Sequence, residues 1–260
     1  MKKKGKGIHN SILTVVTFII FFGVWQIFAI YDIGVGHYMP APTEVFQAFL
    51  YKLDNIGPDG ATLWRNIYTS LYVALTGFGV AVIIGVPLGL LMGWYRLFDR
   101  IVRPLFEIIR PIPAVAWIPL MIIWAGVGLQ AKACIIFFSA FVPCVINSYT
   151  GIRQTNVTLI NVAKTYGASN FYTFLHVGIP SAVPMVFAGM RIALANSWGT
   201  LVAAEMLAAS AGLGYMISMA RSFGRADVVV LGMVVIGLFG FIFTWIFGKV
   251  ESFVNKGGIV

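Results

Sequence analysis

The stretch Asn161-Val162-Ala163-Lys164-Thr165-Tyr166-Gly167 opens a polar interval that ends at Ile179-Pro180. Long apolar blocks flank this interval, which is too polar to span a bilayer itself. Gly167 and Gly178 are expected helix stops, and Ser169 or Asn170 can cap the helical turn between them. We therefore expect a short helix that a membrane protein presents to a cytosolic partner.

The composition places the interval in a membrane protein. Hydrophobic residues make up 59% of the 260 residues and charged residues only 10%, whereas a soluble domain carries about 25% charged residues. The apolar residues form blocks of about 20, the length that crosses a hydrocarbon core, without the alternation of a membrane β-barrel. The fold class is therefore predicted to be all-α and integral to the membrane. Six transmembrane helices are expected, over residues 11–30, 67–94, 105–127, 131–150, 181–208 and 228–247.

The basic residues predict the orientation. One set of loops and ends, which includes Lys2, Lys3, Lys4 and Lys6, carries eleven lysines and arginines, and the other set carries five. Because the more positive side is normally cytoplasmic, both termini and residues 151–180 are expected in the cytosol. The net charge of +9 is thus a topology signal, and nucleic-acid binding is not expected.

We divide the chain into three parts. Residues 1–66 are expected to form a cytoplasmic N-tail, the first span and an outer amphipathic helix over 43–53, capped by Thr43 with Glu44 in its first turn. Residues 67–247 form a five-helix core that includes 151–180, and residues 248–260 form a cytoplasmic C-tail. The first span is too long for a signal peptide, so it is expected to be retained.

Small residues predict close helix packing in the second span. Gly85, Gly89 and Gly93 recur every fourth residue, and Pro87 among them should bend the helix. Cys134 and Cys144 lack His or acidic partners at metal spacing, so both are expected to be buried, inert thiols.

The third and fifth predicted spans contain charges, which are costly inside a membrane. Glu107 and Arg110 precede Pro111, Pro113 and Pro119, and Glu205 lies deep in the fifth span. Two interpretations of Glu107 and Arg110 remain open: an internal ion pair, or the lining of a polar path. A pair between Glu205 and Arg110 is a further hypothesis.

No catalytic constellation is visible in the sequence. His9, His37 and His176 are isolated, and no phosphate-binding G-x-x-x-x-G-K-[ST] loop is present. The interval 151–180 instead carries Phe171, Tyr172, Phe174 and Leu175 at helical spacing, an apolar face suited to a protein groove. A loop folded under the bundle is the alternative.

At this point the residues resemble a known family. The spacing Ala163-x3-Gly167-x9-Val177-x-Ile179-Pro180 is similar to the EAA signature of binding-protein-dependent ABC importer permeases, E-A-A-x3-G-x9-I-x-L-P. Asn161 and Val162 replace its leading Glu and Ala. In that family the signature forms a coupling helix that docks in a groove of the ATPase subunit. Because Asn161 replaces the leading Glu, docking is expected to depend on helix shape and on the aromatic face, and not on an acidic contact.

Other segments are similar to the nitrate/taurine/alkanesulfonate subfamily, and taurine-type permeases are the members that they resemble most. The matching segments are 39–45, Arg110-Pro111-Ile112-Pro113 through Leu120, Trp198 to Glu205, and Gly212-Leu213-Gly214. Gly57-Pro58 before 61–64 adds to this likeness.

The resemblance implies a type I ABC importer permease fold and a non-enzymatic role in the plasma membrane of a prokaryote. It implies a second permease copy, two ATPase subunits that hold ATP and Mg, an extracytoplasmic solute-binding protein and membrane lipid as partners, with no cofactor or metal in this chain. The solute is expected to be small and anionic or zwitterionic, as taurine and alkanesulfonates are. The residues expected to couple to the ATPase are Ala163, Lys164, Tyr166, Gly167, Ala168, Phe171 and Pro180. Those expected along the translocation pathway are Glu107, Arg110, Trp117, Trp198 and Glu205.

Alternatives remain at two levels. Nitrate, bicarbonate, an aromatic acid or a vitamin precursor could replace taurine as the solute. An ion-coupled secondary carrier, which would need internal repeats and more intramembrane acids, and a scaffold without transport are the other classes.

Overall fold

The computed structural model describes residues 4–32, 34 and 39–256. Lys2, Lys3 and His37 lie outside the described residues, as do the side chains of Lys4, Lys6, His9 and Lys256. Within the described part every regular element is helical, which confirms the predicted fold class. The elements are α1 (Lys4–Ile30), α2 (Pro42–Asp54), α3 (Leu63–Trp94), α4 (Arg96–Ile109), η2 (Ala114–Trp117), α5 (Ile118–Ala125), α6 (Leu129–Arg153), α7 (Val157–Thr165), α8 (Asn170–Thr173), η3 (Phe174–Gly178), α9 (Ile179–Ala208), α10 (Leu213–Ser222) and α11 (Ala226–Lys256).

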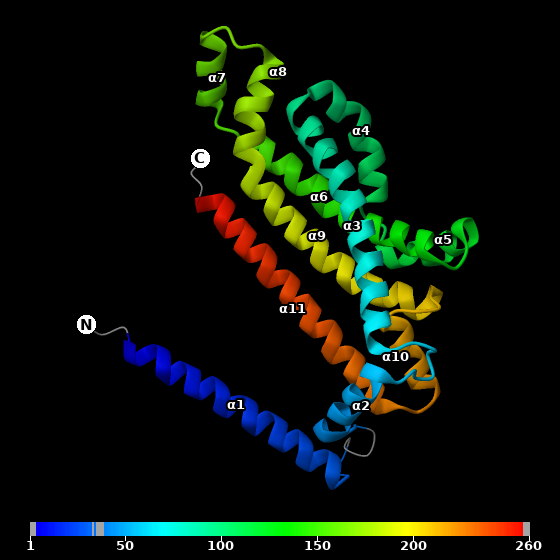
Figure 1. Cartoon of the computed structure of the whole chain (residues 1–260). Helices are drawn as coiled ribbons and strands as arrows, with labels where there is room; N and C mark the ends of the chain where they lie inside the picture. Colours follow the sequence, from blue (N-terminus) through cyan, green and yellow to red (C-terminus); the bar gives the residue numbers. More distant parts are fainter. Residues whose placement is uncertain (1–3, 33, 35–38, 257–260) are drawn as a thin grey trace.

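The helices form an elongated bundle with two distinct ends. Helix α6 packs against α3 on one side and α9 on the other, and α10 and α11 pack beside α9. Figure 1 shows α7 and α8 at one end of the bundle and α2 and α10 at the other. Helix α1 diverges from the bundle and lies near it only at its own carboxyl end, beside α2.

The length and composition of the helices fit membrane spans. Within the described residues five segments qualify, over Leu13–Ile30, Leu63–Trp94, Leu129–Arg153, Asn170–Leu207 and Ala226–Phe253. The predicted span over 105–127, whose prolines indicated a break in the backbone, is bent. Its residues belong to a pair of segments, Arg96–Ile109 and Ala114–Ala125, which meet at 81° and give a sixth span only if the pair is counted as one. Pro111 and Pro113 lie at the break. Proline removes a backbone donor and restricts the residue before it, which explains why the helix is interrupted there.

The glycine stripe of α3 packs closely, as predicted. A Cβ at Gly85 would lie 3.0 Å from the Cβ of Cys144 on α6, and one at Gly93 would lie 2.9 Å from the carbonyl oxygen of Tyr149. The two backbones therefore approach too closely for larger side chains. Helix α3 runs through Pro87 to Trp94.

The outer amphipathic helix is present as α2, but its cap differs from the prediction. Ala41 is the N-cap and Pro42 the first helical residue. The Glu44 carboxylate accepts a hydrogen bond from the Ala41 N–H at 2.9 Å. Thr43 instead bonds to the side chain of Gln26 on α1, with its Oγ1 accepting from Nε2 at 3.1 Å. Thr43 therefore ties α2 to α1 and does not cap α2.

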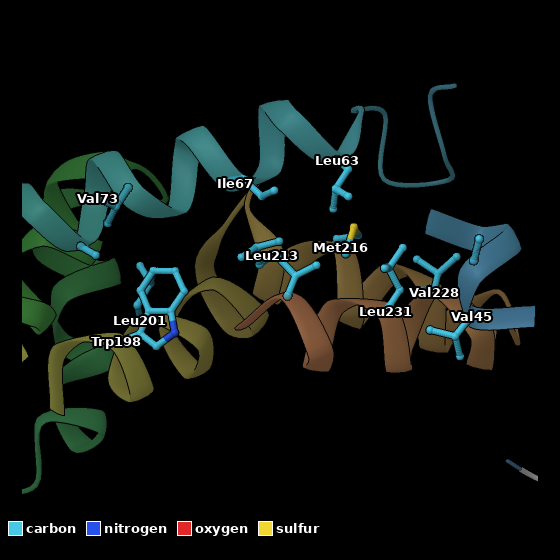
Figure 2. Packing of buried hydrophobic residues seen from close by; sticks show 14 of the residues in the cluster. Val45, Leu63, Ile67, Val73, Trp198, Leu201, Leu213, Met216, Val228 and Leu231 are labelled. Atoms are coloured by element: carbon cyan, nitrogen blue, oxygen red, sulfur yellow. The ribbon is translucent and has the colours of Figure 1, made fainter. Parts of the chain in front are cut away.

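The main apolar core lies at the α2–α10 end. Figure 2 shows Leu63 and Ile67 of α3 directed toward Leu213 and Met216 of α10, with Leu231 of α11 beside Met216 in the same cluster. Met216 and Leu213 are almost wholly buried. The buried apolar side chains of this cluster hold the short helix α10 against the spans.

Candidate functional site

The interval that opens the sequence folds as a helix, a turn and a second helix at one end of the bundle. Asn156 caps α7, since its Oδ1 accepts from the Thr158 N–H at 2.8 Å. Helix α7 ends where Gly167 adopts a φ of +80°. The N–H of Ala168 then donates to the Ala163 oxygen at 3.0 Å, and that of Gly167 to the Lys164 oxygen at 2.9 Å. This pair of bonds is a Schellman motif, which explains the predicted helix stop at Gly167.

The second helix begins at Asn170 and does not stop at Gly178. Ser169 is its N-cap, and the Ser169 Oγ accepts from the Tyr172 N–H at 3.2 Å. A π-helical turn, η3, follows α8, and the chain continues into α9, so that Asn170–Leu207 form one helical segment. The predicted stop at Gly178 is therefore wrong. A Cβ there would lie 2.8 Å from the Trp94 ring, so Gly178 provides room for α3.

One side of the second helix is anchored to the bundle. Phe174 is buried against the rings of Trp94 and Tyr95, each with its centroid 5.6 Å away. The Trp94 Nε1–H also donates to the Asn170 Oδ1 at 3.2 Å. These contacts fix the helix on α3 and leave its other side free.

The free side is apolar and exposed. Tyr166 has 88% of its surface exposed and Phe171 has 61%. Tyr172 and Leu175 are exposed next to Phe171, and on α7 the exposed apolar residues include Val157 and Val162. We name this surface, at residues 157–175, the α7–α8 face. Helix α7 has no buried residue among its nine, which contradicts the alternative of a loop folded under the bundle.

The expected coupling residues occupy this face or its edge. Lys164, Tyr166 and Gly167 are exposed, and Ala163 and Ala168 are half-buried around the turn. Pro180, also half-buried, is the second residue of α9 and directly follows the π-helical turn η3. The structure thus brings together Ala163 to Phe171, and places Pro180 farther along the helix.

A groove of about 520 Å³ lies between the α4–η2 bend, α6 and α9. Its polar lining residues include Arg110, Ser139, Asn196 and Thr200. The hydroxyls of Ser139 on α6 and Thr200 on α9 are 2.8 Å apart, a hydrogen bond across the two helices. The rest of the lining is apolar or small, and we name this feature the α6–α9 groove.

The predicted pathway residues divide between this groove and the core. Arg110 lines the groove, and its Nη1 lies 3.4 Å from the Glu107 Oε2 with both side chains about half exposed. The hypothesis of an Arg110–Glu205 pair is wrong, because Arg110 pairs within its own helical turn and Glu205 has other partners. Trp117 stacks on Phe138, a groove residue, with ring centroids 4.5 Å apart.

Glu205 and Trp198 belong to the buried interior. The Trp198 Nε1–H donates to the Ile236 oxygen at 2.9 Å, which joins α9 to α11. Glu205 is wholly buried, and both its oxygens lie 2.8 Å from the Ser70 Oγ. Its Oε2 also accepts from the Gly214 N–H at 2.9 Å.

The partners of Glu205 explain the Gly212-Leu213-Gly214 motif. The three successive N–H groups at the start of α10 donate to Asn66 Oδ1, Ser70 Oγ and Glu205 Oε2, at 3.1, 2.8 and 2.9 Å. A carboxylate and two polar groups at a helix N-terminus satisfy its free N–H groups and its dipole. Gly212 has a φ of +126°, which favours glycine. We name this arrangement the α10 cap.

Sequence reasoning missed most of this polar interior. Lys52 of α2 is wholly buried and its Nζ pairs with Asp59 Oδ1 at 2.6 Å. Asp59 in turn accepts from the Asn66 Nδ2 at 2.6 Å, which links the pair to the α10 cap. The available signal was polar residues near the ends of apolar blocks, which are expensive unless they are paired. Among the described residues no group of three His, Cys, Asp or Glu side chains could hold a metal.

Comparison with known proteins identifies the class. Residues 85–256 match the family described as binding-protein-dependent transport system inner membrane component. The chain is 34% identical over 230 residues to the taurine transport system permease protein TauC of Escherichia coli (strain K12), with 88% of this chain and 84% of TauC covered. It is 34% identical over 217 residues to the putative aliphatic sulfonates transport permease protein SsuC of the same strain, covering 84% and 81%. The nitrate import permease protein NrtB of Leptolyngbya laminosa is 30% identical over 251 residues, covering 95% and 89%.

A solved structure shows the same fold. The MetNI methionine ABC transporter in inward facing conformations matches with a TM-score of 0.65 at 21% identity, covering 74% of this chain and 95% of the matched chain. The fold is therefore that of a type I ABC importer permease. The chain belongs to the family of binding-protein-dependent transport system inner membrane components. This confirms the predicted membership in the nitrate/taurine/alkanesulfonate subfamily of ABC importer permeases.

Proposed function

We propose that this permease imports a small sulfonate such as taurine, delivered by an extracytoplasmic binding protein. The names of TauC and SsuC support a sulfonate, and that of NrtB keeps nitrate as the second candidate. Both solutes are small anions or zwitterions whose acceptor oxygens need hydrogen-bond donors. ATP and Mg bind to two separate ATPase subunits, and this chain performs no catalysis.

The α7–α8 face is the proposed docking surface for the ATPase, and it carries the proposal. An exposed Tyr166 and Phe171 on ordered helical turns would be costly in water but can fill a groove on a second protein. The helix that bears Phe171 continues into the membrane span as far as Leu207. A push on the α7–α8 face therefore moves one end of a helix whose other end contributes to the α10 cap.

A second copy of the chain is the proposed partner within the membrane. Helix α1 is apolar along Leu13–Ile30 and none of that window is buried within one copy. Its divergence from the bundle (Figure 1) leaves it free to pack on lipid and on the second copy. With the α7–α8 face in the cytosol, the α2–α10 end faces outward, where the binding protein docks and where the positive-inside rule places fewer basic residues.

One matched pair of variants tests the ATPase surface. Phe171 and Phe223 are both 61% exposed, but Phe223 follows α10 at the opposite end of the bundle. Phe171→Asp places a charge in the proposed interface, so the cognate ATPase, co-expressed with the permease, should co-purify at least about ten-fold less. Phe223→Asp should retain it.

The measurement is the molar ratio of ATPase to permease after affinity purification in mild detergent. Membrane insertion of each variant is checked by its recovery in the membrane fraction, and its folded state by its elution volume. Equal ATPase recovery with both variants would remove the docking assignment. Accumulation of radiolabelled taurine by the purified chain alone in vesicles under an ion gradient would replace the importer with a secondary carrier.

A further inference from the structure

The α6–α9 groove has polar walls at a depth where lipid cannot satisfy them. Asn196 and Thr200 are one turn apart on α9, inside the span Asn170–Leu207. Asn196 and Gly199 are exposed in the single chain, and a Cβ at Gly199 would meet nothing within 4 Å. An exposed amide facing hydrocarbon is costly, so this strip of α9 faces water, a solute or protein.

The opposite walls complete a small cavity of mixed character. Ser139 on α6 hydrogen-bonds to Thr200 across the groove floor, and Phe138 and Val142 add apolar surface beside it. The volume of about 520 Å³ falls within the range of small-molecule sites, although the groove of a single copy is open on one side. The groove therefore has room for one small solute between an apolar wall and a polar wall.

The chemistry of the lining selects an anion. Among the described lining residues the only charge is that of Arg110, and no carboxylate lines the groove. Asn196 contributes an amide N–H₂, and Ser139 and Thr200 share two hydroxyls. Glu107 is within 3.4 Å of Arg110 and moderates its charge. A weakened charge suits a transport site, since a solute held too tightly is not released.

We propose that Asn196, Thr200 and Ser139 hold the anionic head of the transported solute in the α6–α9 groove, with Arg110 supplying the positive charge. The ligand class is a small organic sulfonate or carboxylate with at least two acceptor oxygens. Its short apolar chain lies against Phe138 and Val142. The proposal rests on the proposed function, because it takes the solute to pass along this face of α9.

Conservative variants separate this role from folding and from ATPase docking. Thr200→Val and Asn196→Leu keep side-chain volume but remove the donors. In proteoliposomes with ATPase and binding protein, each should lower the amount of taurine moved per ATP hydrolysed by about ten-fold, the effect of one lost hydrogen bond to a charged group. Thr76→Val is the matched control, because Thr76 is a hydroxyl residue of α3 that bonds to the Tyr72 oxygen in its own helix.

A cysteine at the groove measures occupancy directly. In a Cys134→Ser background, which removes a native thiol that is exposed and not buried as predicted, Gly199→Cys places a thiol in the groove without removing a proposed solute ligand. This thiol should react with a charged methanethiosulfonate reagent, and saturating taurine should slow that reaction several-fold. Spontaneous or copper-catalysed crosslinking of Gly199→Cys between two copies, with no protection by taurine, would show that a second copy fills the groove and would overturn the site.

The outcomes distinguish this proposal from the importer function. Unchanged transport per ATP in Thr200→Val and Asn196→Leu, with normal ATPase stimulation by the binding protein, would overturn the groove while the function stands. Failure of the unmodified permease to form an ATPase complex would overturn both.

Discussion

Helix α9 carries two polar regions that differ in how their hydrogen bonds are satisfied. Near its carboxyl end Glu205 is wholly buried and bonds to Ser70 and to the N–H of Gly214. Asn196, about two and a half turns earlier, is exposed, and Thr200, about one and a half turns earlier, bonds across to Ser139. In the first region the polar groups have hydrogen-bond partners within one chain. The second region keeps a hydrogen-bond donor that is exposed, and space beside it that the chain does not fill.

The difference teaches how to read polar residues in a membrane helix. A buried charge that has partners for each oxygen stabilises the fold, and its removal leaves those partners without bonds. A polar strip left exposed at membrane depth has to be satisfied by something outside the chain. The sequence analysis placed Glu205 among the pathway candidates, but its contacts are those of a structural cap.

The largest expected effect comes from breaking the α10 cap. Glu205→Ala leaves the buried Gly214 N–H and Ser70 hydroxyl without their acceptor. At about 1–3 kcal/mol for each buried donor left unpaired, we expect a loss of about 2–5 kcal/mol in unfolding free energy. Glu205→Gln keeps an acceptor oxygen and should lose clearly less. The measurement is the thermal midpoint and monodisperse yield in detergent.

The comparison would fail if Glu205→Ala were as stable as Thr200→Val. Thr200→Val removes a half-buried hydroxyl from the groove, and we expect it to change stability by about 1 kcal/mol or less. Equal stability would mean that the bonds of the α10 cap contribute nothing net, and Glu205 would return to the list of pathway residues.

Substitutions at two glycines test the same contrast between the α10 cap and the α6–α9 groove, and their expected effects on stability are of intermediate size. A Cβ at Gly214 would lie 2.5 Å from the Val202 oxygen and 2.8 Å from the Glu205 Cβ, so Gly214→Ala should cost about 1–3 kcal/mol through overpacking. Gly199→Ala meets nothing within 4 Å, and alanine favours a helix interior. We therefore expect Gly199→Ala to leave thermal stability unchanged or slightly raised. A larger loss in Gly199→Ala than in Gly214→Ala would contradict the assignment of closed and open regions.

The sequence predicted the features that depend on local patterns. Hydropathy located the spans because each is a long apolar block, and Gly167 and Ser169 were recognisable helix-end residues. The close approach at Gly85 followed from spacing alone. These signals lie within one element, so no knowledge of its neighbours was needed.

Features that depend on contacts between distant elements were not predictable. The sequence pattern of Gly178 is that of a helix stop, yet its role is to admit the ring of Trp94 from another helix. Glu205 and Ser70 are 135 residues apart in the chain, and nothing local indicated that they meet. The 81° bend between α4 and the η2–α5 segment was not predictable either. Prolines indicated a break there but not its angle.

The smallest expected effect belongs to the exposed ion pair of Glu107 and Arg110, and the buried pair of Lys52 and Asp59 serves as its comparison. Glu107 and Arg110 are about half exposed and 3.4 Å apart, so solvent screens them, and Glu107→Gln should change the unfolding free energy by about 0.5 kcal/mol or less. Lys52 and Asp59 are buried at 2.6 Å, and Asp59→Asn leaves the Lys52 ammonium without a counter-charge. Thermal unfolding of both variants at two salt concentrations is the measurement. Because salt screens only exposed pairs, any small change in Glu107→Gln should vanish at high salt while the loss in Asp59→Asn persists. A salt-insensitive loss in Glu107→Gln would instead place Glu107 and Arg110 in a dry interior, closed off from the groove that Arg110 is proposed to serve.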